Sequence, residues 1–138
     1  MQTKAVFIDR DGVLNKSKVI NKKPYAPSTL EEFCILPDTV EPLIELKTEN
    51  YILAVVTNQP DVGNGFLEKE VVEEMHQQLI DRLPIDIIKV CYHHQLEDCE
   101  CRKPKPGMLI EIANEFNVDL QHSYMIGDRK SDIEAGIA

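Results

Sequence analysis

Two aspartates after a short apolar segment are the residues best suited to chemistry. Asp9 and Asp11 flank Arg10 in the run Asp9-Arg10-Asp11-Gly12, directly after the apolar residues 5–8. A carboxylate can attack a phosphorus centre and form an aspartyl-phosphate, while a second carboxylate can protonate the leaving oxygen and later activate water. Aspartate and glycine are also ordinary turn residues, so this run alone leaves a plain polar turn as the alternative.

Four short runs rich in valine and isoleucine predict the strands that would position this pair. They lie at residues 4–8, 51–57, 86–92 and 123–127, and they read as buried strands. Apolar residues at helical spacing fall between them, over 40–46, 71–80 and 109–116. Buried strands that alternate with helices are typical of a parallel sheet covered on both faces. The sequence therefore predicts a doubly wound α/β fold with right-handed crossovers.

Polar side chains stand at the ends of three of these four strands. The first strand ends in the aspartate pair, the second in Thr57-Asn58, and the fourth in Gly127-Asp128, with Asp132 one helical turn later. Ligands in open α/β sheets bind outside the carboxyl ends of the strands. Such a coordinated set of aspartates and a hydroxyl favours phosphate or metal chemistry over polar residues that only fill surface.

Composition limits the class of protein. The chain has 138 residues, 43% of them hydrophobic and 28% charged, which suits one ordinary globular domain. It shows no long apolar stretch and no signal-peptide pattern, so we expect a cytoplasmic protein. The chain ends at Ala138 within a helix-like segment. We predict a single domain over residues 1–138 and leave open whether its final strand and helix are missing.

The net charge of -9 sets a condition on the substrate. Nucleic acids and anionic membranes attract basic faces, so neither is expected as the main partner. A phosphorylated substrate is also anionic and would need local cations or metal ions at its site. We expect a small phosphorylated molecule as the partner, and a monomeric protein.

The longest irregular region is predicted from Asn15 to about Leu36, and it starts beside the aspartate pair. It carries four lysines, namely Lys16, Lys18, Lys22 and Lys23. A loop of this length inside a compact domain usually has a function, so we expect it to form one wall of the site. Cys34, within the same region, is expected to be a small buried side chain.

Three cysteines and two histidines lie within the eleven residues 91–101 and could hold a metal ion. Three thiolates and one imidazole would make a closed tetrahedral zinc site of the structural type. The ligands would be Cys91, Cys99, Cys101 and either His93 or His94. A disulfide is the alternative, although Cys99 and Cys101 are too close in sequence for an unstrained mutual bond. Bound zinc would order the loop that leads into Arg102 and Lys103.

Four motifs resemble, in order, those of the haloacid dehalogenase-like (HAD-like) phosphatases. They are Asp9-x-Asp11-Gly12, Thr57-Asn58, Arg102-Lys103-Pro104 and Gly127-Asp128-x-x-x-Asp132, and they span nearly the whole chain. The segment from Cys91-x-His93 to Cys99-x-Cys101-Arg102-Lys103-Pro104 is more closely similar to the zinc-containing branch. That branch includes D-glycero-D-manno-heptose 1,7-bisphosphate 7-phosphatase and histidinol-phosphate phosphatase. Its Cys-x-His spacing favours His93 as the zinc ligand.

The resemblance implies catalytic roles for four residues. Asp9 would be the nucleophile and Asp11 the general acid and base. Thr57 and Lys103 would hold the phosphoryl oxygens and stabilise their charge during transfer.

The resemblance also implies a metal and a set of substrate contacts. Mg²⁺ would be held by Asp9, Asp128 and the main-chain carbonyl of Asp11, since it prefers hard oxygen ligands. Arg102 would contact substrate, because a guanidinium suits a second phosphate or sugar hydroxyls. Asn58 and Arg129 complete the expected set of substrate-binding residues.

One stretch departs from the branch that the chain resembles. Heptose phosphatases usually read Thr-Asn-Gln-Ser-Gly, then a small residue and Arg-Gly, whereas the stretch from Pro60 to Gly65 lacks both the serine and the arginine. This loop is expected to lie over the pocket mouth, so the departure bears on the substrate rather than on the catalytic positions. No large inserted cap domain is visible between the motifs, and loops would then select a small substrate.

The sequence favours a magnesium-dependent phosphatase of heptose 1,7-bisphosphate or a related sugar phosphate. The five-residue gap between His93 and Cys99 also suits a histidinol-phosphate phosphatase, which Pro106-Gly107-Met108 argues against mildly. A phospho-accepting signalling domain is a different class that also uses a strand-end aspartate and Mg²⁺, but it would not need Asp11 as an acid. A zinc-stabilised interaction module without catalysis has no supporting feature, because every catalytic position is filled.

Overall fold

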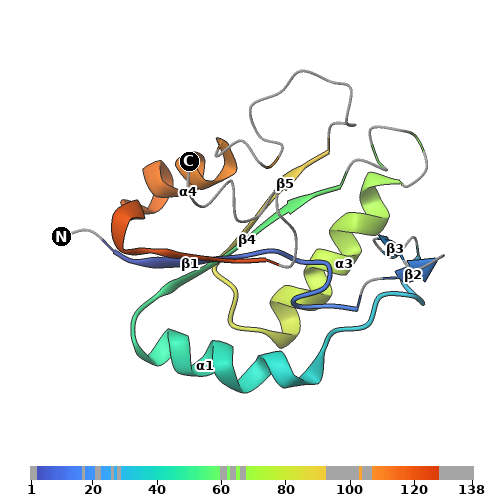
Figure 1. The fold of residues 1–138 in the computed structure, drawn as a ribbon, viewed down its shortest axis with the longest axis horizontal. Coiled ribbons are helices and arrows are strands. Elements are labelled where there is room, and N and C mark those ends of the chain that lie inside the picture. The colour runs from blue at the N-terminus through green and yellow to red at the C-terminus, as the bar shows by residue number, and fades with distance from the viewer. Residues whose placement is uncertain are drawn as a thin grey trace.

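A parallel sheet of four strands is the centre of the fold (Figure 1). The computed structural model describes residues 3–16, 18–20, 23–25, 27, 29–59, 62, 65, 68–92, 103 and 107–127. Within them the strands are β1 (Ala5–Ile8), β4 (Ile52–Asn58), β5 (Ile87–Cys91) and β6 (Tyr124–Ile126), in the order β5-β4-β1-β6. All three strand pairs are parallel. Each strand falls on one of the four predicted runs, so the prediction of a parallel α/β sheet is confirmed.

Helices cover both faces of this sheet. They are α1 (Val40–Thr48), α3 (Lys69–Arg82) and α4 (Gly107–Phe116), and each falls on a predicted helical segment. The short 3₁₀ turns η1 (Pro37–Thr39) and η2 (Leu120–His122) precede α1 and β6. Figure 1 shows α1 and α3 on one side of the sheet and α4 on the other, as a doubly wound fold requires.

Alternation along the central strands divides the apolar side chains between two cores. Val6 and Ile8 of β1 lie in the cluster that includes Leu43 of α1 and Met75 of α3. Phe7 lies in the other cluster, with side chains of α4. Because both faces of the sheet are covered, its two central strands have no polar face, which is why their sequences read as continuous apolar runs.

The connections change from one face of the sheet to the other between β1 and β6. From β1 the chain moves outward through α1 and α3 to β4 and β5, and α4 then returns it to β6 on the other side of β1. Neighbouring strands whose connections leave on opposite faces mark the point where open α/β sheets bind ligands, at the carboxyl ends of the strands. Asp9 is at this point, and its N–H donates to the carbonyl of Ile126 at 2.9 Å.

The region from Asn15 to Leu36 was predicted to be irregular. It contains an antiparallel pair of strands. These are β2 (Lys18–Ile20) and β3 (Lys23–Tyr25). Strands of three residues are too short for side-chain alternation to reveal, and Pro24 lowers the strand signal further. The expectation that Cys34 is buried is wrong: its side chain is exposed, and its neighbour Phe33 takes the buried position.

Candidate active site

The alternation of β1 continues past its last residue and separates the two charged side chains that follow. Asp9 continues the direction of Phe7 toward the α4 face, where it meets Lys103. Arg10 continues the direction of Ile8 toward the α1 and α3 face, where it contacts α3. The extended chain thus places an anionic and a cationic side chain on opposite faces of the sheet.

A tight turn after Arg10 presents Asp11 at the end of the sheet. The N–H of Leu14 donates to the carbonyl of Arg10 at 2.9 Å, and the N–H of Gly12 donates to the carbonyl of Asn15 at 2.8 Å. Gly12 has a φ of 86°, a left-handed conformation that a side chain would strain. The glycine of the motif is therefore required by the turn that carries Asp11.

Asp9 and Lys103 form a buried ion pair. Nζ of Lys103 lies 2.8 Å from Oδ1 of Asp9, and the two side chains are 4% and 8% exposed. The same ammonium donates to the carbonyl of Val56 at 3.1 Å. Lys103 therefore places a positive charge beside Asp9, so an anionic substrate would not meet that carboxylate alone.

Asn58, the last residue of β4, holds the backbone of Lys103. Its Nδ2 donates to the Lys103 carbonyl at 3.3 Å, and its Oδ1 accepts the Lys103 N–H at 3.1 Å. An amide side chain that pairs with both the N–H and the carbonyl of one residue fixes the backbone of that residue in place. Asn58 therefore positions the lysine, and its expected contact with substrate stays a prediction.

The carboxylate of Asp11 accepts four hydrogen bonds. Three reach Oδ1, from Nε and Nη2 of Arg10 at 3.0 and 2.9 Å and from Nδ2 of Asn15 at 3.0 Å. The fourth reaches Oδ2, from Nε2 of Gln59 at 3.0 Å. The guanidinium fork makes a charge-assisted contact in a nearly dry environment, so the orientation of the carboxylate is fixed in advance of any substrate.

Arg10 is fully buried and its outer nitrogen faces α3. Nη1 lies 3.2 Å from Nε2 of His76 and 3.6 Å from Sδ of Met75, and the guanidinium carbon lies 5.4 Å from the centre of the Phe33 ring. Since arginine only donates, Nε2 of His76 must accept. Burial, and then the charge of Arg10, lower the pKa of His76 from 6.5 to about 3, while Asp11 opposes the shift. His76 is therefore a buried neutral acceptor.

This shift predicts how stability depends on pH. The unfolded chain binds the His76 proton near pH 6.5 and the folded chain only near pH 3, so stability is complete above 6.5 and falls as the pH drops toward 3. Between pH 7.5 and pH 5 this single group removes about 2 kcal/mol from the free energy of unfolding. His76→Gln keeps an acceptor for Arg10 and cannot be protonated. Urea unfolding at both pH values should show a loss about 2 kcal/mol smaller in the variant than in the wild type; equal losses would contradict the buried neutral histidine.

Comparisons with known proteins identify the family. A HAD-hydrolase-like family model matches residues 100–138. The chain is 36% identical to the D-glycero-beta-D-manno-heptose-1,7-bisphosphate 7-phosphatase of Pasteurella multocida, with 96% of this chain and 75% of that protein covered. The chain belongs to the D-glycero-D-manno-heptose-1,7-bisphosphate 7-phosphatase family. It is a HAD-type phosphatase, a phosphoric monoester hydrolase. The resemblance to the HAD-like phosphatases is confirmed, whereas the zinc of the branch stays a prediction.

Two further members of the heptose-bisphosphate phosphatase family are also similar to this chain. The D-glycero-alpha-D-manno-heptose-1,7-bisphosphate 7-phosphatase of Campylobacter jejuni is 36% identical, with 99% of this chain and 78% of that protein covered. The crystal structure of D,D-heptose 1,7-bisphosphate phosphatase from B. bronchiseptica, complexed with magnesium and phosphate, matches with a TM-score of 0.83 at 28% identity. That match covers 96% of this chain and 74% of the other. The names of the Pasteurella multocida and Campylobacter jejuni proteins differ in the anomer, beta in the first and alpha in the second.

The structure brings together the four residues expected to be catalytic from the family motifs. Asp9 pairs with Lys103, and Asp11 is joined to Thr57 through Gln59. The remaining predicted residues lie outside the described part of the chain; they are His93, His94, Cys99, Cys101, Arg102, Asp128, Arg129 and Asp132. Within the described part, no three His, Cys, Asp or Glu side chains gather as a metal site. The magnesium and zinc ligand sets therefore stay predictions.

Cys91, the fourth expected zinc ligand, is the last residue of β5. It is fully buried, and its carbonyl accepts the N–H of Gln59 at 2.8 Å. Its thiol is disulfide-bonded, whereas Cys34, the other cysteine in the described part, is free. A disulfide is the alternative to zinc at this cluster, and the two differ in what the purified protein should contain.

Three residues that hold Asp11 were not among the predicted site residues: Arg10, Asn15 and Gln59. Strand alternation could have indicated two of them, because Arg10 continues the direction of Ile8 and Gln59 stands two residues after Thr57. No sequence signal of this kind marks Asn15, which reaches Asp11 only because the turn at Gly12 reverses the chain.

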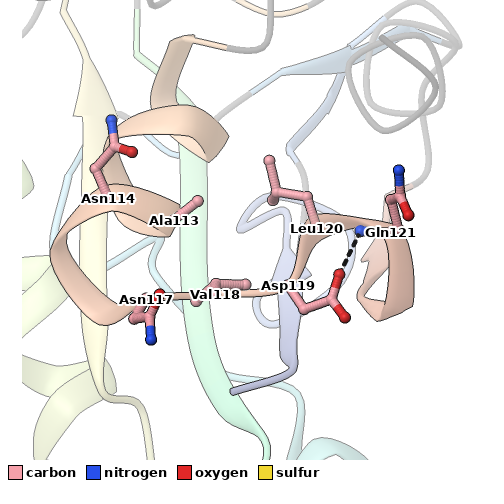
Figure 2. A pocket seen from close by; sticks show the side chains of 7 residues that line it. All are labelled: Ala113, Asn114, Asn117, Val118, Asp119, Leu120 and Gln121. Atoms are coloured by element: carbon pink, nitrogen blue, oxygen red, sulfur yellow. Dashed lines mark hydrogen bonds between the residues drawn. The ribbon is translucent and has the colours of Figure 1, made fainter. Parts of the chain in front are cut away.

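A surface pocket lies around the end of α4 and the segment that follows it, and Figure 2 shows the side chains that line it. It has a volume of about 490 Å³ and is lined by Ala113, Asn114, Asn117, Val118, Asp119, Leu120 and Gln121. Thr3, which precedes β1, accepts from the N–H of Asp119 at 2.8 Å. The pocket is therefore next to the start of β1, whereas Asp9 follows its end, so the pocket takes no part in the chemistry of the aspartate pair.

Proposed function

We propose that the chain is a magnesium-dependent phosphatase that removes the 7-phosphate of D-glycero-D-manno-heptose 1,7-bisphosphate through an aspartyl-phosphate on Asp9. The observation that carries the proposal is the pair of buried carboxylates, Asp9 and Asp11, after β1, with Lys103 2.8 Å from the first. The family membership supports the substrate, because the relatives are named for this reaction.

In the first step, a carboxylate oxygen of Asp9 attacks the phosphorus while the bond from phosphorus to the sugar oxygen breaks. Asp11, protonated at the start, passes its proton to the departing oxygen. In the second step, Asp11 takes a proton from a water molecule as that water attacks the phosphorus. The bond between Asp9 and phosphorus then breaks, which returns both carboxylates to their starting state and releases inorganic phosphate.

Thr57 and Lys103 stabilise the transferred group. Lys103 places a buried ammonium beside Asp9, where negative charge builds up on the phosphoryl oxygens. Thr57, 1% exposed at the end of β4, supplies a hydroxyl donor.

The donor chemistry here fits Mg²⁺, which prefers carboxylate and carbonyl oxygens. Asp9, the main-chain carbonyl of Asp11 and Asp128 would hold the ion. When bound, it reduces the repulsion between an anionic nucleophile and an anionic substrate. A relative in the family has been crystallised with magnesium and phosphate, which supports this choice of metal.

Arg102 and Arg129 are the proposed contacts to the rest of the substrate, since a guanidinium binds a second phosphate in a fork. The stretch from Pro60 to Gly65, where the sequence departs from the usual heptose phosphatase pattern, is proposed to influence the choice of anomer. A cytoplasmic location and a monomeric state belong to the same proposal. No helix in the described part of the chain is long and apolar enough to cross a membrane.

The proposal is tested by phosphate release with Mg²⁺ from both anomers of heptose 1,7-bisphosphate and from histidinol phosphate. We expect kcat/KM for one bisphosphate anomer to exceed that for histidinol phosphate by about 100-fold or more. Phosphorus NMR should show heptose 1-phosphate as the product. Preference for histidinol phosphate would instead assign the chain to the alternative branch, and stable phosphorylation without turnover would indicate a signalling domain.

We also propose that the reduced chain binds a structural zinc ion through Cys91, His93, Cys99 and Cys101, in place of the disulfide at Cys91. Protein purified under reducing conditions without chelators should contain about one zinc per chain. Cys91→Ser should lose the metal, and Cys34→Ser, which removes an exposed free thiol, should keep it. Absence of zinc in the wild type, with a mass showing Cys91 oxidised, would leave the disulfide as the correct assignment.

A further inference from the structure

Gln59 links three strand ends through a single buried residue. It follows β4, is 1% exposed, and its backbone N–H donates to the carbonyl of Cys91 at 2.8 Å. Its side-chain Nε2 donates to Oδ2 of Asp11 at 3.0 Å and to Oγ1 of Thr57 at 2.9 Å. A primary amide nitrogen carries two hydrogens, and these two contacts use both.

The same contacts fix the direction in which the amide points. While Asp11 is ionised, turning the amide over would place the carbonyl oxygen of Gln59 against a carboxylate oxygen of Asp11, acceptor against acceptor in a buried site. In that state Gln59 therefore donates to both of its partners.

This direction determines what the hydroxyl of Thr57 can do. Its oxygen already accepts from Gln59, so its own hydrogen must be given to another acceptor. In the described part of the chain, no hydrogen bond donated by this hydroxyl is found. An oxygen of a transferred phosphoryl group is the kind of acceptor that would complete it.

Gln59 also bears on which oxygen of Asp11 reacts. Oδ1 accepts three hydrogen bonds, from Arg10 and Asn15, whereas Oδ2 accepts only the one from Gln59. Oδ2 therefore keeps room for a proton, and Oδ1 does not. In the two steps given above, Oδ2 is the atom that would give its proton to the leaving oxygen and later take one from water.

We propose that Gln59 is a positioning residue for the acid and base step. It holds Oδ2 of Asp11 at a fixed place relative to the hydroxyl of Thr57. The proton on Oδ2 and the phosphoryl group bound by Thr57 then keep one relative position. This inference rests on the proposed aspartyl-phosphate chemistry, and it adds to it a residue that acts through Asp11 and Thr57.

The test compares leaving groups in Gln59→Leu, which keeps the size of the side chain and removes both donors. Phenoxide needs a proton as it leaves far more than p-nitrophenoxide does, so misplacing the acid should harm phenyl phosphate more. We expect kcat for phenyl phosphate to fall at least about tenfold further than kcat for p-nitrophenyl phosphate, with KM for both nearly unchanged. Gln59→Glu is the second variant if Gln59→Leu does not fold.

Gln77→Leu is the matched control, because Gln77 donates from Nε2 to Asp81 at 2.9 Å on an exposed surface of α3. It should leave both rates at the wild-type value. Equal losses for the two phosphates, or no loss, would overturn the positioning role. A wild type that hydrolyses both aryl phosphates but not heptose bisphosphate would contradict the proposed substrate alone, because the Gln59 comparison uses only aryl phosphates.

Discussion

Asp9→Asn should lower kcat for phosphate release by about 10⁴-fold or more, because an amide oxygen is too weak a nucleophile to form the covalent intermediate. The substitution keeps the shape of the side chain and an acceptor for Lys103, which lies 2.8 Å from Oδ1 in the wild type. The fold should therefore survive. Steady-state phosphate release with Mg²⁺, together with circular dichroism of the variant, checks both parts of this prediction.

The control for this variant is Asp38→Asn, which changes an exposed aspartate in η1, remote in sequence from the strand end. It should retain full activity. If Asp9→Asn kept more than a small fraction of the wild-type rate after exclusion of deamidation by mass spectrometry, Asp9 would not be the nucleophile.

Lys103→Met should lower kcat by about 10²- to 10³-fold, the usual effect of removing one group that stabilises transition-state charge. The same change leaves the buried carboxylate of Asp9 without its ammonium, and breaking a buried pair in this way costs about 3–5 kcal/mol of folding free energy. Mg²⁺ bound beside Asp9 would replace part of the lost positive charge. We therefore expect Mg²⁺ to raise the stability of the variant while leaving its activity low.

Lys89→Met is the matched control for the lysine. Lys89 lies 2.8 Å from Glu115, the same distance as in the buried pair, but its side chain is 26% exposed. It should lose no activity and little stability, since ion pairs near the surface contribute little. An equal effect of the two substitutions on activity would contradict the role given to Lys103.

Much of the fold followed from side-chain pattern because both faces of the sheet are buried. Runs such as the one around Val55 have no polar face, and together with helices at regular spacing they allow few arrangements other than a parallel sheet. The three-residue strands at Lys18–Ile20 and Lys23–Tyr25 were not predicted, because they are too short to show an alternating side-chain pattern. The exposure of Cys34 was not predicted either. Only one of two adjacent side chains turns inward here, and Phe33 is the one that does.

The site was predictable where a residue's chemistry is visible in its own motif, and less so where it depends on a distant contact. Asp9 and Lys103 were expected to act together, and they are joined directly although 94 positions separate them. The roles of Arg10 and His76 depend on helix α3 lying against the end of β1, which no local pattern specifies.

The measurement that tests the account most directly is the covalent state of Asp9 during turnover. Protein mixed with Mg²⁺ and heptose 1,7-bisphosphate is quenched in acid, reduced with borohydride and digested, so that an aspartyl-phosphate is recovered as homoserine. We predict homoserine at residue 9, dependent on both substrate and Mg²⁺ and absent from Asp9→Asn. Modification at another residue, or steady turnover with no modified protein at any quench time, would contradict the proposed mechanism.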